Sequence, residues 1–138
     1  NILKTKEFVV NFVTNTMSQK MNLSSIDAPK DIDEFYFSKI KKRKSKKVKP
    51  FSVSNSPVNL ECRLLQKVDL KSSLKNKFHN KIIIGEVVGI YINNQFIKDG
   101  RIDSTAMQYV GRLGYAEYTT IKSKFKMKRP SWKEFSKK

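Results

Sequence analysis

The stretch SPVNLECRLLQKVDL, residues 56–70, alternates apolar and polar side chains with a period of two. This period belongs to a strand, in which successive side chains point to opposite faces, and not to a helix. The apolar side carries Val58, Leu60, Cys62 and Leu64. The polar side carries Asn59, Glu61 and Arg63. The pattern predicts a half-buried strand of an antiparallel sheet, with Leu60, Cys62 and Leu64 facing the core and Glu61 exposed to solvent.

A second strand signal is KIIIGEVVGIYIN, residues 81–93, which is apolar on both faces. Two apolar faces favour a central strand, with one face on the core and the other on a partner surface. We expect it to pair with the 58–70 strand in one antiparallel sheet. Gly85 and Gly89 predict bulges or a close approach of the backbone. Glu86 is then a buried carboxylate that needs a cation or backbone donors, supplied locally or across a dimer interface.

Shorter elements are expected on either side of these strands. Before them we predict a helix end at 1–5, a strand at 7–13, a short helix at 14–23 capped by Thr14 or Asn15, and a loop at 24–35. Residues 71–80 form a polar connection. After them we predict turns at Asn93-Asn94 and Asp99-Gly100, a short helix at 103–114 capped by Asp103 or Ser104, and a strand at 115–123. We expect Trp132 and Phe135 to pack the basic tail onto the body. Several strands with only short helices indicate a β-rich barrel or sandwich.

The chain has one domain's worth of residues, 138, and a formal net charge of +17. Such a charge indicates a polyanion partner. The alternative is a biased composition, because lysine far outnumbers arginine, the residue that phosphate-binding proteins favour. The most basic run is residues 39–49. Like charges at this density predict an exposed loop without regular structure. A nucleic-acid patch is the alternative, although the run lacks aromatic residues for base stacking.

The single cysteine, Cys62, and the single histidine, His79, limit the chemistry of the chain. One cysteine cannot form an internal disulfide, which fits a reducing compartment and a cytoplasmic location. One cysteine and one histidine do not supply the ligands of a zinc site. A thiol on the apolar face of a strand is expected to be buried and inert. No apolar run approaches the length of a membrane span.

Several segments, in this order, resemble the flavin reductase-like family, the FMN-binding split barrels. They are NI and EFVVN in residues 1–11, MNLSS and DEF in residues 21–35, SPVNLECRL (56–64), IIIGEVVGIYI (82–92), and DGRID, GRLG and Tyr118 in residues 99–118. The family includes reductase components of two-component monooxygenases and flavoredoxin-type proteins. The resemblance covers about residues 1–130 as one domain and leaves 131–138 as a basic C-terminal tail.

The resemblance implies a mainly β fold, an FMN-binding split β-barrel of Greek-key antiparallel strands with short helices. In the family, the equivalent of Asn1-Ile2 closes a motif that the first barrel strands precede, together with most contacts to the FMN phosphate. The chain is therefore expected to be N-terminally incomplete. His79 lies one residue upstream of the histidine that many members carry, so no role is transferred to it.

The resemblance also implies an activity: NAD(P)H-dependent reduction of FMN, or electron transfer through bound flavin. It implies a homodimer with FMN near the interface and a possible monooxygenase partner or a separate N-terminal segment; neither nucleic acid nor membrane is an expected partner. One alternative is a remnant of such a protein with little or no flavin binding. A second alternative, resting on charge alone, is a basic nucleic-acid-binding module.

For the site, the resemblance implies Arg112, Tyr118 and Asn1 as cofactor-binding residues. Arg112 would pair with a phosphate or flavin oxygen, unless it is a helix-end arginine that bonds local carbonyl groups. Tyr118 would stack on or bond to the flavin, unless it is a packed barrel tyrosine. No catalytic side chain is predicted, because hydride passes directly from nicotinamide to flavin. Tyr115 stands where the family often has a second glycine.

Overall fold

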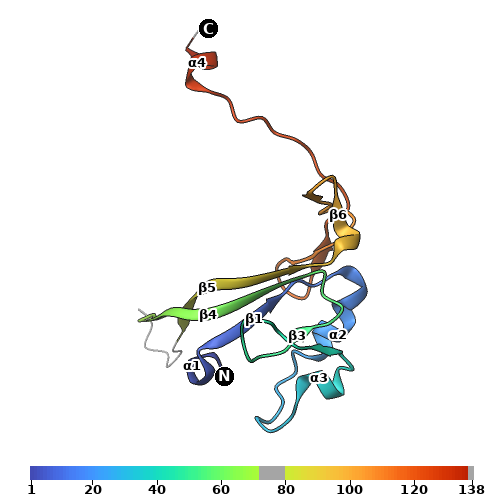
Figure 1. Ribbon diagram of the computed structural model, residues 1–138, viewed down its shortest axis with the longest axis vertical. Coiled ribbons are helices and arrows are strands. Elements are labelled where there is room, and N and C mark those ends of the chain that lie inside the picture. The colour runs from blue at the N-terminus through green and yellow to red at the C-terminus, as the bar shows by residue number, and fades with distance from the viewer. Residues whose placement is uncertain (72–79, 137–138) are drawn as a thin grey trace.

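The computed structural model describes residues 1–71 and 80–136, and its largest element is a three-stranded antiparallel sheet. The strand order is β1 (Glu7–Asn11), β4 (Val58–Asp69) and β5 (Lys81–Ile92) (Figure 1). The predicted antiparallel pairing of the two long strands is confirmed. The central strand is β4, however, and no further strand pairs with β5 among the described residues, so the prediction that 81–93 is central was wrong. Most of the predicted connection at 71–80, His79 included, lies outside the described residues.

Two register shifts interrupt the pairing of β4 with β5, one between Glu61 and Cys62 and one between Leu64 and Gln66. At each shift one strand carries an extra residue, which bends and twists the pair. The shifts lie beside Gly89 and Gly85, as predicted. A Cβ atom on Gly85 would overlap the ring of Phe8 on β1. Gly85 therefore leaves room for the Phe8 ring to lie against the backbone of β5.

The two faces of the sheet differ in what covers them. Helices α2 (Ser18–Leu23) and α3 (Glu34–Phe37) and the β2 (Lys42–Arg43)–β3 (Ser52–Val53) ribbon lie on one side (Figure 1). The other side we call the open face, because its middle row, Val10, Leu60 and Ile90, has no covering element among the described residues. Ile90 is 65% exposed. The predicted core side is thus only partly closed: Cys62 is buried, whereas Leu60 and Leu64 are half-buried.

Glu61 is buried, with 6% exposure, so the prediction that it faces solvent was wrong. Its carboxylate accepts hydrogen bonds from the backbone N–H groups of Lys46, at 3.0 Å, and Lys47, at 2.6 Å. Burial alone would raise the pKa of Glu61, but the backbone N–H groups of residues 46–48 outweigh it and lower the pKa below its usual value. The period-two pattern locates the face of Glu61 correctly, but cannot show that a loop covers that face.

The same contacts correct the prediction of an irregular loop at 39–49. Lys42–Arg43 form a strand, and both Ser45 and Val48 are buried. Arg43 donates to Oδ1 of Asn59 and lies over the Tyr91 ring, 3.3 Å from its centroid. The lysine side chains remain mostly on the surface. The backbone that carries them is held in place by its hydrogen bonds to the buried Glu61 carboxylate. Charge density governs where the side chains go, but here it does not prevent regular structure.

The remaining elements are short. Helix α1 (Ile2–Thr5), β1 and β9 (Tyr118–Thr120) confirm the elements predicted at 1–5, 7–13 and 115–123, and η1 (Asn15–Met17) with α2 confirms the helix at 14–23. Thr14 precedes η1, but its side chain caps nothing there. Helix α3 overlaps the predicted loop at 24–35, because the Asp33 carboxylate caps its first turn. The Asn93-Asn94 hairpin turn is instead the 3-10 turn η2 (Asn94–Phe96), whereas Asp99-Gly100 does turn the chain between β6 (Ile97–Lys98) and β7 (Arg101–Ile102).

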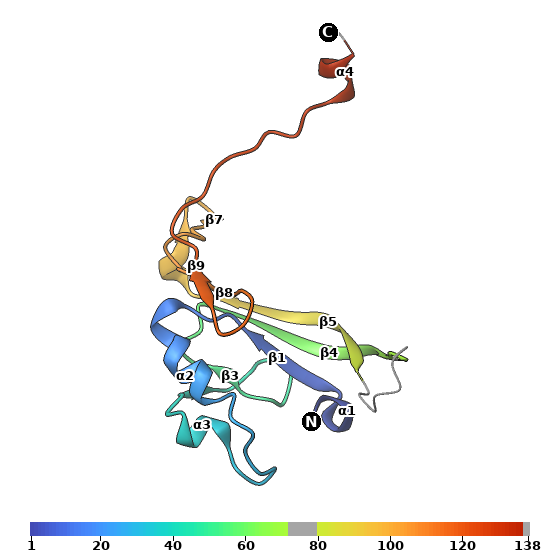
Figure 2. The same ribbon diagram turned by 180° about the vertical axis from the view of Figure 1, so that it is seen from behind.

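Three further predictions were wrong. Residues 104–108 form turns rather than a helix, because the chain pairs directly after them: the N–H of Val110 bonds the carbonyl of Val13 and starts strand β8 (Val110–Arg112). Glu86 is exposed and not buried, because it lies on an edge strand. Trp132 and Phe135 do not pack on the body, because they lie in α4 (Trp132–Phe135), which is far from the sheet (Figure 2). Their ring centroids are 5.8 Å apart, so the two rings contact each other.

We expect Cys62 to react slowly with a thiol reagent in the native protein. The thiol is buried, and burial raises its pKa, so little reactive thiolate forms at neutral pH. Labelling followed by mass spectrometry, with and without denaturant, measures the rate. Equal rates in the two conditions would contradict the burial of Cys62.

Glu61→Gln should destabilise the protein by about 2–3 kcal/mol, because two backbone donors lose a charged acceptor. The pKa of Glu61 is lower in the folded chain than its ordinary 4.5. The contribution of Glu61 to the free energy of unfolding is therefore complete above about pH 4.5, and it disappears as the pH falls through the pKa of the folded state. Urea unfolding from pH 7 to pH 3 should show a steeper loss of stability for the wild type than for Glu61→Gln.

Glu117→Gln is the matched control, since it removes the same charge from an exposed position in the turn between β8 and β9. It should change the free energy of unfolding by less than about 0.5 kcal/mol. Hydrogen exchange adds a local test: the Lys46 and Lys47 amides should be protected in the wild type and lose protection in Glu61→Gln. Equal effects of the two substitutions would contradict the role given to Glu61.

Candidate functional site

A cavity of about 480 Å³ lies between helix α2 and the hairpin of β8 and β9. Its lining includes residues from both ends of the chain: Asn15, Ser18, Gln19, Arg112, Tyr118 and Thr120. Figure 2 shows α2 close to β8 and β9, at the end of the sheet far from the N-terminus. The volume lies in the range of small-molecule sites. We take this cavity as the candidate functional site.

The hairpin places two predicted site residues together. Arg112 and Tyr118 are directly paired across β8 and β9, and side chains of paired residues project from the same face. Nη1 of Arg112 donates to the Tyr118 hydroxyl at 3.2 Å, and Nη2 donates to the Tyr115 carbonyl at 3.2 Å. The guanidinium carbon is 5.6 Å from the centroid of the Tyr118 ring. These bonds hold the guanidinium beside the phenol at the cavity wall.

The continuation of β1 fixes this hairpin to the sheet. Thr14 forms an antiparallel bridge with Tyr109, and the Asn15 N–H bonds the Gln108 carbonyl at 3.1 Å. The rings of Phe12 and Tyr109 meet edge to face, with centroids 5.3 Å apart. Burial raises the pKa of the Tyr109 hydroxyl. The cavity wall therefore depends on contacts between residues almost one hundred positions apart in the sequence.

The charge of the cavity favours an anion or an electron-rich polar group. Arg112 is the single charged side chain among the described residues that line it, and no carboxylate lines it among those residues. Asn15, Ser18 and Thr120 add neutral donors and acceptors. A guanidinium with no competing carboxylate binds phosphate or carbonyl oxygen through paired N–H donors. The Tyr118 ring beside it offers a flat surface for an aromatic ligand.

The third predicted site residue, Asn1, lies elsewhere. It precedes α1, which leads into the Glu7 end of β1, whereas the cavity begins beyond the Asn11 end (Figure 2). Arg112 is on a strand and not at a helix end. It does donate to a local carbonyl, that of Tyr115, as the alternative to cofactor binding predicted. No local pattern marks Asn15, Ser18 or Thr120 as site residues, since short polar side chains are common in turns, at helix starts and on exposed strands.

Other kinds of site are not evident. Within residues 1–71 and 80–136, no three His, Cys, Asp or Glu side chains gather closely enough to hold a metal ion. In the same part of the chain, no helix has the length and apolarity that crossing a bilayer requires.

Two comparisons of the sequence with known proteins find related chains. Residues 1–112 match the family model described as flavin reductase like domain. An uncharacterised protein of Deinococcus radiodurans is 30% identical over 139 aligned residues, which cover 98% of this chain and 58% of that protein. The chain spans about three fifths of the length of the curated relatives it matches, at 58%, 62% and 59% for three of them.

Solved structures share the fold. Nitrilotriacetate monooxygenase component B from Bacillus cereus superposes with a TM-score of 0.84 at 20% identity, over 92% of this chain and 62% of that one. A protein assigned as a flavin reductase with a split barrel domain, from Shewanella frigidimarina, gives 0.75 at 22% identity, over 96% and 63%. The mainly β split-barrel fold predicted from the sequence is thereby confirmed, although the described strands do not close a barrel.

Tyr115→Gly should stabilise the chain slightly. Tyr115 has a positive φ of 55° and is 97% exposed, so its side chain gains little from packing while its backbone is strained. Relief of a left-handed conformation, about 1–2 kcal/mol, exceeds the entropic cost of glycine, about 0.5–1 kcal/mol. Thermal unfolding should show a raised midpoint.

Tyr36→Gly is the matched control, because Tyr36 is also highly exposed but lies within helix α3. There the same substitution should lower stability by up to about 1 kcal/mol. If both variants were destabilised alike, Tyr115 would not be strained.

Proposed function

The chain belongs to the flavin reductase-like domain family, and from this membership we propose that it holds FMN as a redox group that NAD(P)H reduces. The α2–β8–β9 cavity is the part of the flavin site that these residues supply. Arg112 and Tyr118 are its cofactor-binding residues. Asn1, far from this cavity, would contact the flavin only where a second copy or a further segment brings it close.

The observation that carries the proposal is the pairing of one guanidinium with one phenol in a cavity free of carboxylates among its described residues. Binding requires Arg112 to exchange its bond to the Tyr118 hydroxyl, or to the Tyr115 carbonyl, for one to a flavin or phosphate oxygen. Such exchange is inexpensive, because both present bonds are exposed to solvent. The residues thus fit an anionic, aromatic ligand.

Bound FMN would supply the redox chemistry, since flavins accept hydride from nicotinamide directly. The protein's own part is positioning and electrostatics. The guanidinium of Arg112 would favour a build-up of negative charge beside it. The Tyr118 ring would limit the orientation of a flat ligand, and its hydroxyl would continue the hydrogen bonding of Arg112.

Partners follow from surfaces that the described part of the chain leaves uncovered. We assign the open face to further barrel strands, supplied by a longer form of the protein or by a separate segment, because half-buried Leu60 and exposed Ile90 form an apolar row. A homodimer with FMN near its interface, and a monooxygenase component that receives reduced flavin, are proposed on the basis of the family. The free thiol of Cys62 fits the reducing cytoplasm.

FMN binding measured by equilibrium dialysis tests the site. The 138-residue chain should bind FMN weakly, because only one charged contact is present in the described cavity. Arg112→Ala should weaken that binding by a further 10- to 100-fold, the loss of a charged hydrogen bond of about 1.5–3 kcal/mol. Addition of the N-terminal segment of a longer relative should strengthen binding to the wild type.

Arg101→Ala is the matched control, because Arg101 is an exposed arginine on β7 and does not line the cavity. It removes the same charge and should leave FMN affinity unchanged. Equal losses in the two variants would mean that net charge, and not the cavity, attracts FMN. Absence of binding even with the added segment would favour the remnant that no longer holds flavin.

A further inference from the structure

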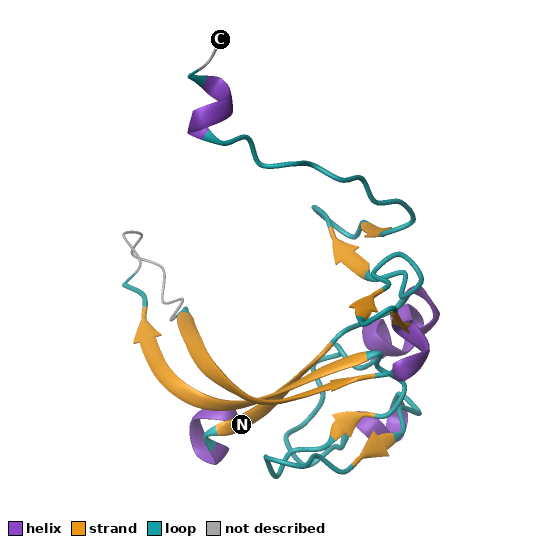
Figure 3. Ribbon diagram, turned by 45° about the horizontal axis from the view of Figure 1, so that its top comes forward, coloured by secondary structure: helices purple, strands orange, loops and turns teal. Residues whose placement is uncertain are grey.

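Residues 121–136, which we call the C-terminal arm, leave the body after β9 and run outward in extended conformation to α4 (Figure 3). Five large apolar side chains on the arm are exposed: Ile121, Phe125, Met127, Trp132 and Phe135. Phe125 is 84% exposed and Trp132 is 78% exposed. So much apolar surface on one segment marks an interaction site.

The outer end of the arm, residues 128–136, is held together by its own contacts. Ser131 and Glu134 form a capping box at the start of α4, and Lys128 pairs with Glu134 at 3.0 Å. Its bonds to the body lie near its root: the Ile121 N–H donates to the Tyr109 carbonyl at 3.0 Å, and Lys124 pairs with Asp103 at 3.3 Å. Beyond that point the arm is available to another surface.

The sequence pattern of the arm indicates what kind of surface it meets. Lysines at 122, 124, 126 and 128 alternate with Phe125 and Met127 in extended backbone, so cations and apolar groups project to opposite sides. This is the pattern of a strand laid on a protein, with its apolar side inward and its charged side in water. A nucleic acid would instead require the cations and aromatic rings on one side.

A matching surface lies at the far end of the β4–β5 hairpin. Pairing of β1 with β4 ends at Arg63, so the hairpin beyond it has no third strand among the described residues. Leu65, Ile82 and Ile84 are exposed there. Glu86 is also exposed, and no ion pair joins it or Lys126 within residues 1–71 and 80–136.

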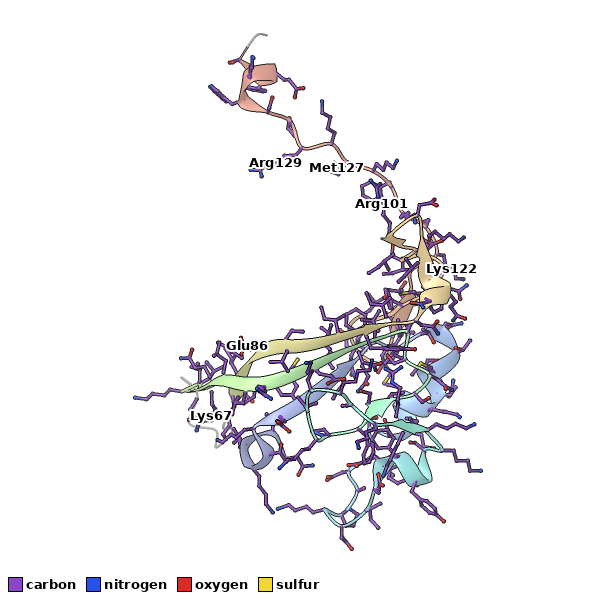
Figure 4. The ribbon with its side chains drawn as sticks, viewed as in Figure 1. Lys67, Glu86, Arg101, Lys122, Met127 and Arg129 are labelled. Carbon is purple, nitrogen blue, oxygen red and sulfur yellow. The ribbon has the colours of Figure 1, made fainter. Side chains whose placement is uncertain are left out.

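The arm does not lie against this surface on its own chain. Figure 4 shows Glu86 and Lys67 at one end of the sheet, and Arg101 and Lys122 beyond the opposite end. Met127 and Arg129 lie still farther from the sheet (Figure 4). The arm and the end of the hairpin are two apolar surfaces that do not meet within one chain. In a dimer with a twofold axis, the arm of each copy can pack on the hairpin of the other.

We propose that the C-terminal arm of one protomer packs on the β5 end of a second copy, around Ile82, Ile84 and Glu86, and that the second arm does the same in return. Phe125 and Met127 cover the isoleucines, and Lys126 pairs with Glu86. This arm exchange rests on the homodimer of the proposed function, but it does not require flavin.

Disulfide trapping tests the exchange directly. Met127→Cys in one sample of the full chain is mixed with Ile84→Cys in another sample that carries a size tag, and the mixture is oxidised mildly. Cys62 is buried and remains in both. The expected product is the mixed disulfide, more abundant than either self-linked dimer. Ile32→Cys, on an exposed loop, is the matched control and should form little mixed product.

A single chain that carries both Met127→Cys and Ile84→Cys distinguishes exchange from self-packing. Exchange predicts linked dimers, whereas a cyclised monomer would overturn the proposal. Phe125→Ser with Met127→Ser should raise the dimer dissociation constant at least 10-fold in light scattering. Lys44→Ser with Lys46→Ser, which removes charge from the 39–49 run, should leave it unchanged.

The outcomes separate this inference from the proposed function. A dimer without the mixed disulfide overturns the arm exchange and leaves flavin binding untouched. A monomer that binds phosphatidylserine vesicles or DNA through the arm overturns it as well. Loss of FMN binding with an intact mixed disulfide would count against the flavin site alone.

Discussion

The carboxylate of Glu61 is the contact on which the covered half of the sheet depends. A buried anion requires donors, and the N–H groups of Lys46 and Lys47 supply them. This requirement draws the most basic stretch of the chain onto β4. Asn59, fully buried beside it, donates to Asn11 and accepts from Arg43. Polar contacts thus attach the β2–β3 ribbon to the sheet where an apolar core would normally do so.

The two faces of the sheet therefore differ in what covers them. The face under Glu61 is closed by the chain's own loop, whereas the open face presents Val10, Leu60 and Ile90. The candidate site lies at neither face but at the end of the sheet, where Thr14 and Asn15 meet Tyr109 and Gln108. A local change in the cavity need not disturb the Glu61 contacts, because no residue is shared between them.

The candidate site could be predicted in part. Arg112 and Tyr118 are six positions apart in the sequence, and their pairing across a short hairpin is a local event. Asn15, Ser18 and Thr120 join them only through long-range contacts, which no local pattern records. Asn1 was grouped with them by resemblance, but β1 separates the two places. Local motifs identify candidate residues, and the path of the chain decides which of them meet.

The sequence by itself determined the two long strands, their antiparallel partnership and the positions of their bulges, because period-two alternation and glycine act on the backbone locally. Tertiary structure decided which polar residues are buried and which apolar ones are not. Glu61 and Asn59 are covered because a distant loop donates to them, while Glu86, Trp132 and Phe135 are exposed because nothing among the described residues reaches them. The turns at 104–108 were decided in the same way: the Val13 carbonyl accepts the bond from the Val110 N–H, which a helix would have directed four residues back along the chain. Burial depends on what a side chain meets in space, and one strand's pattern carries no information about that.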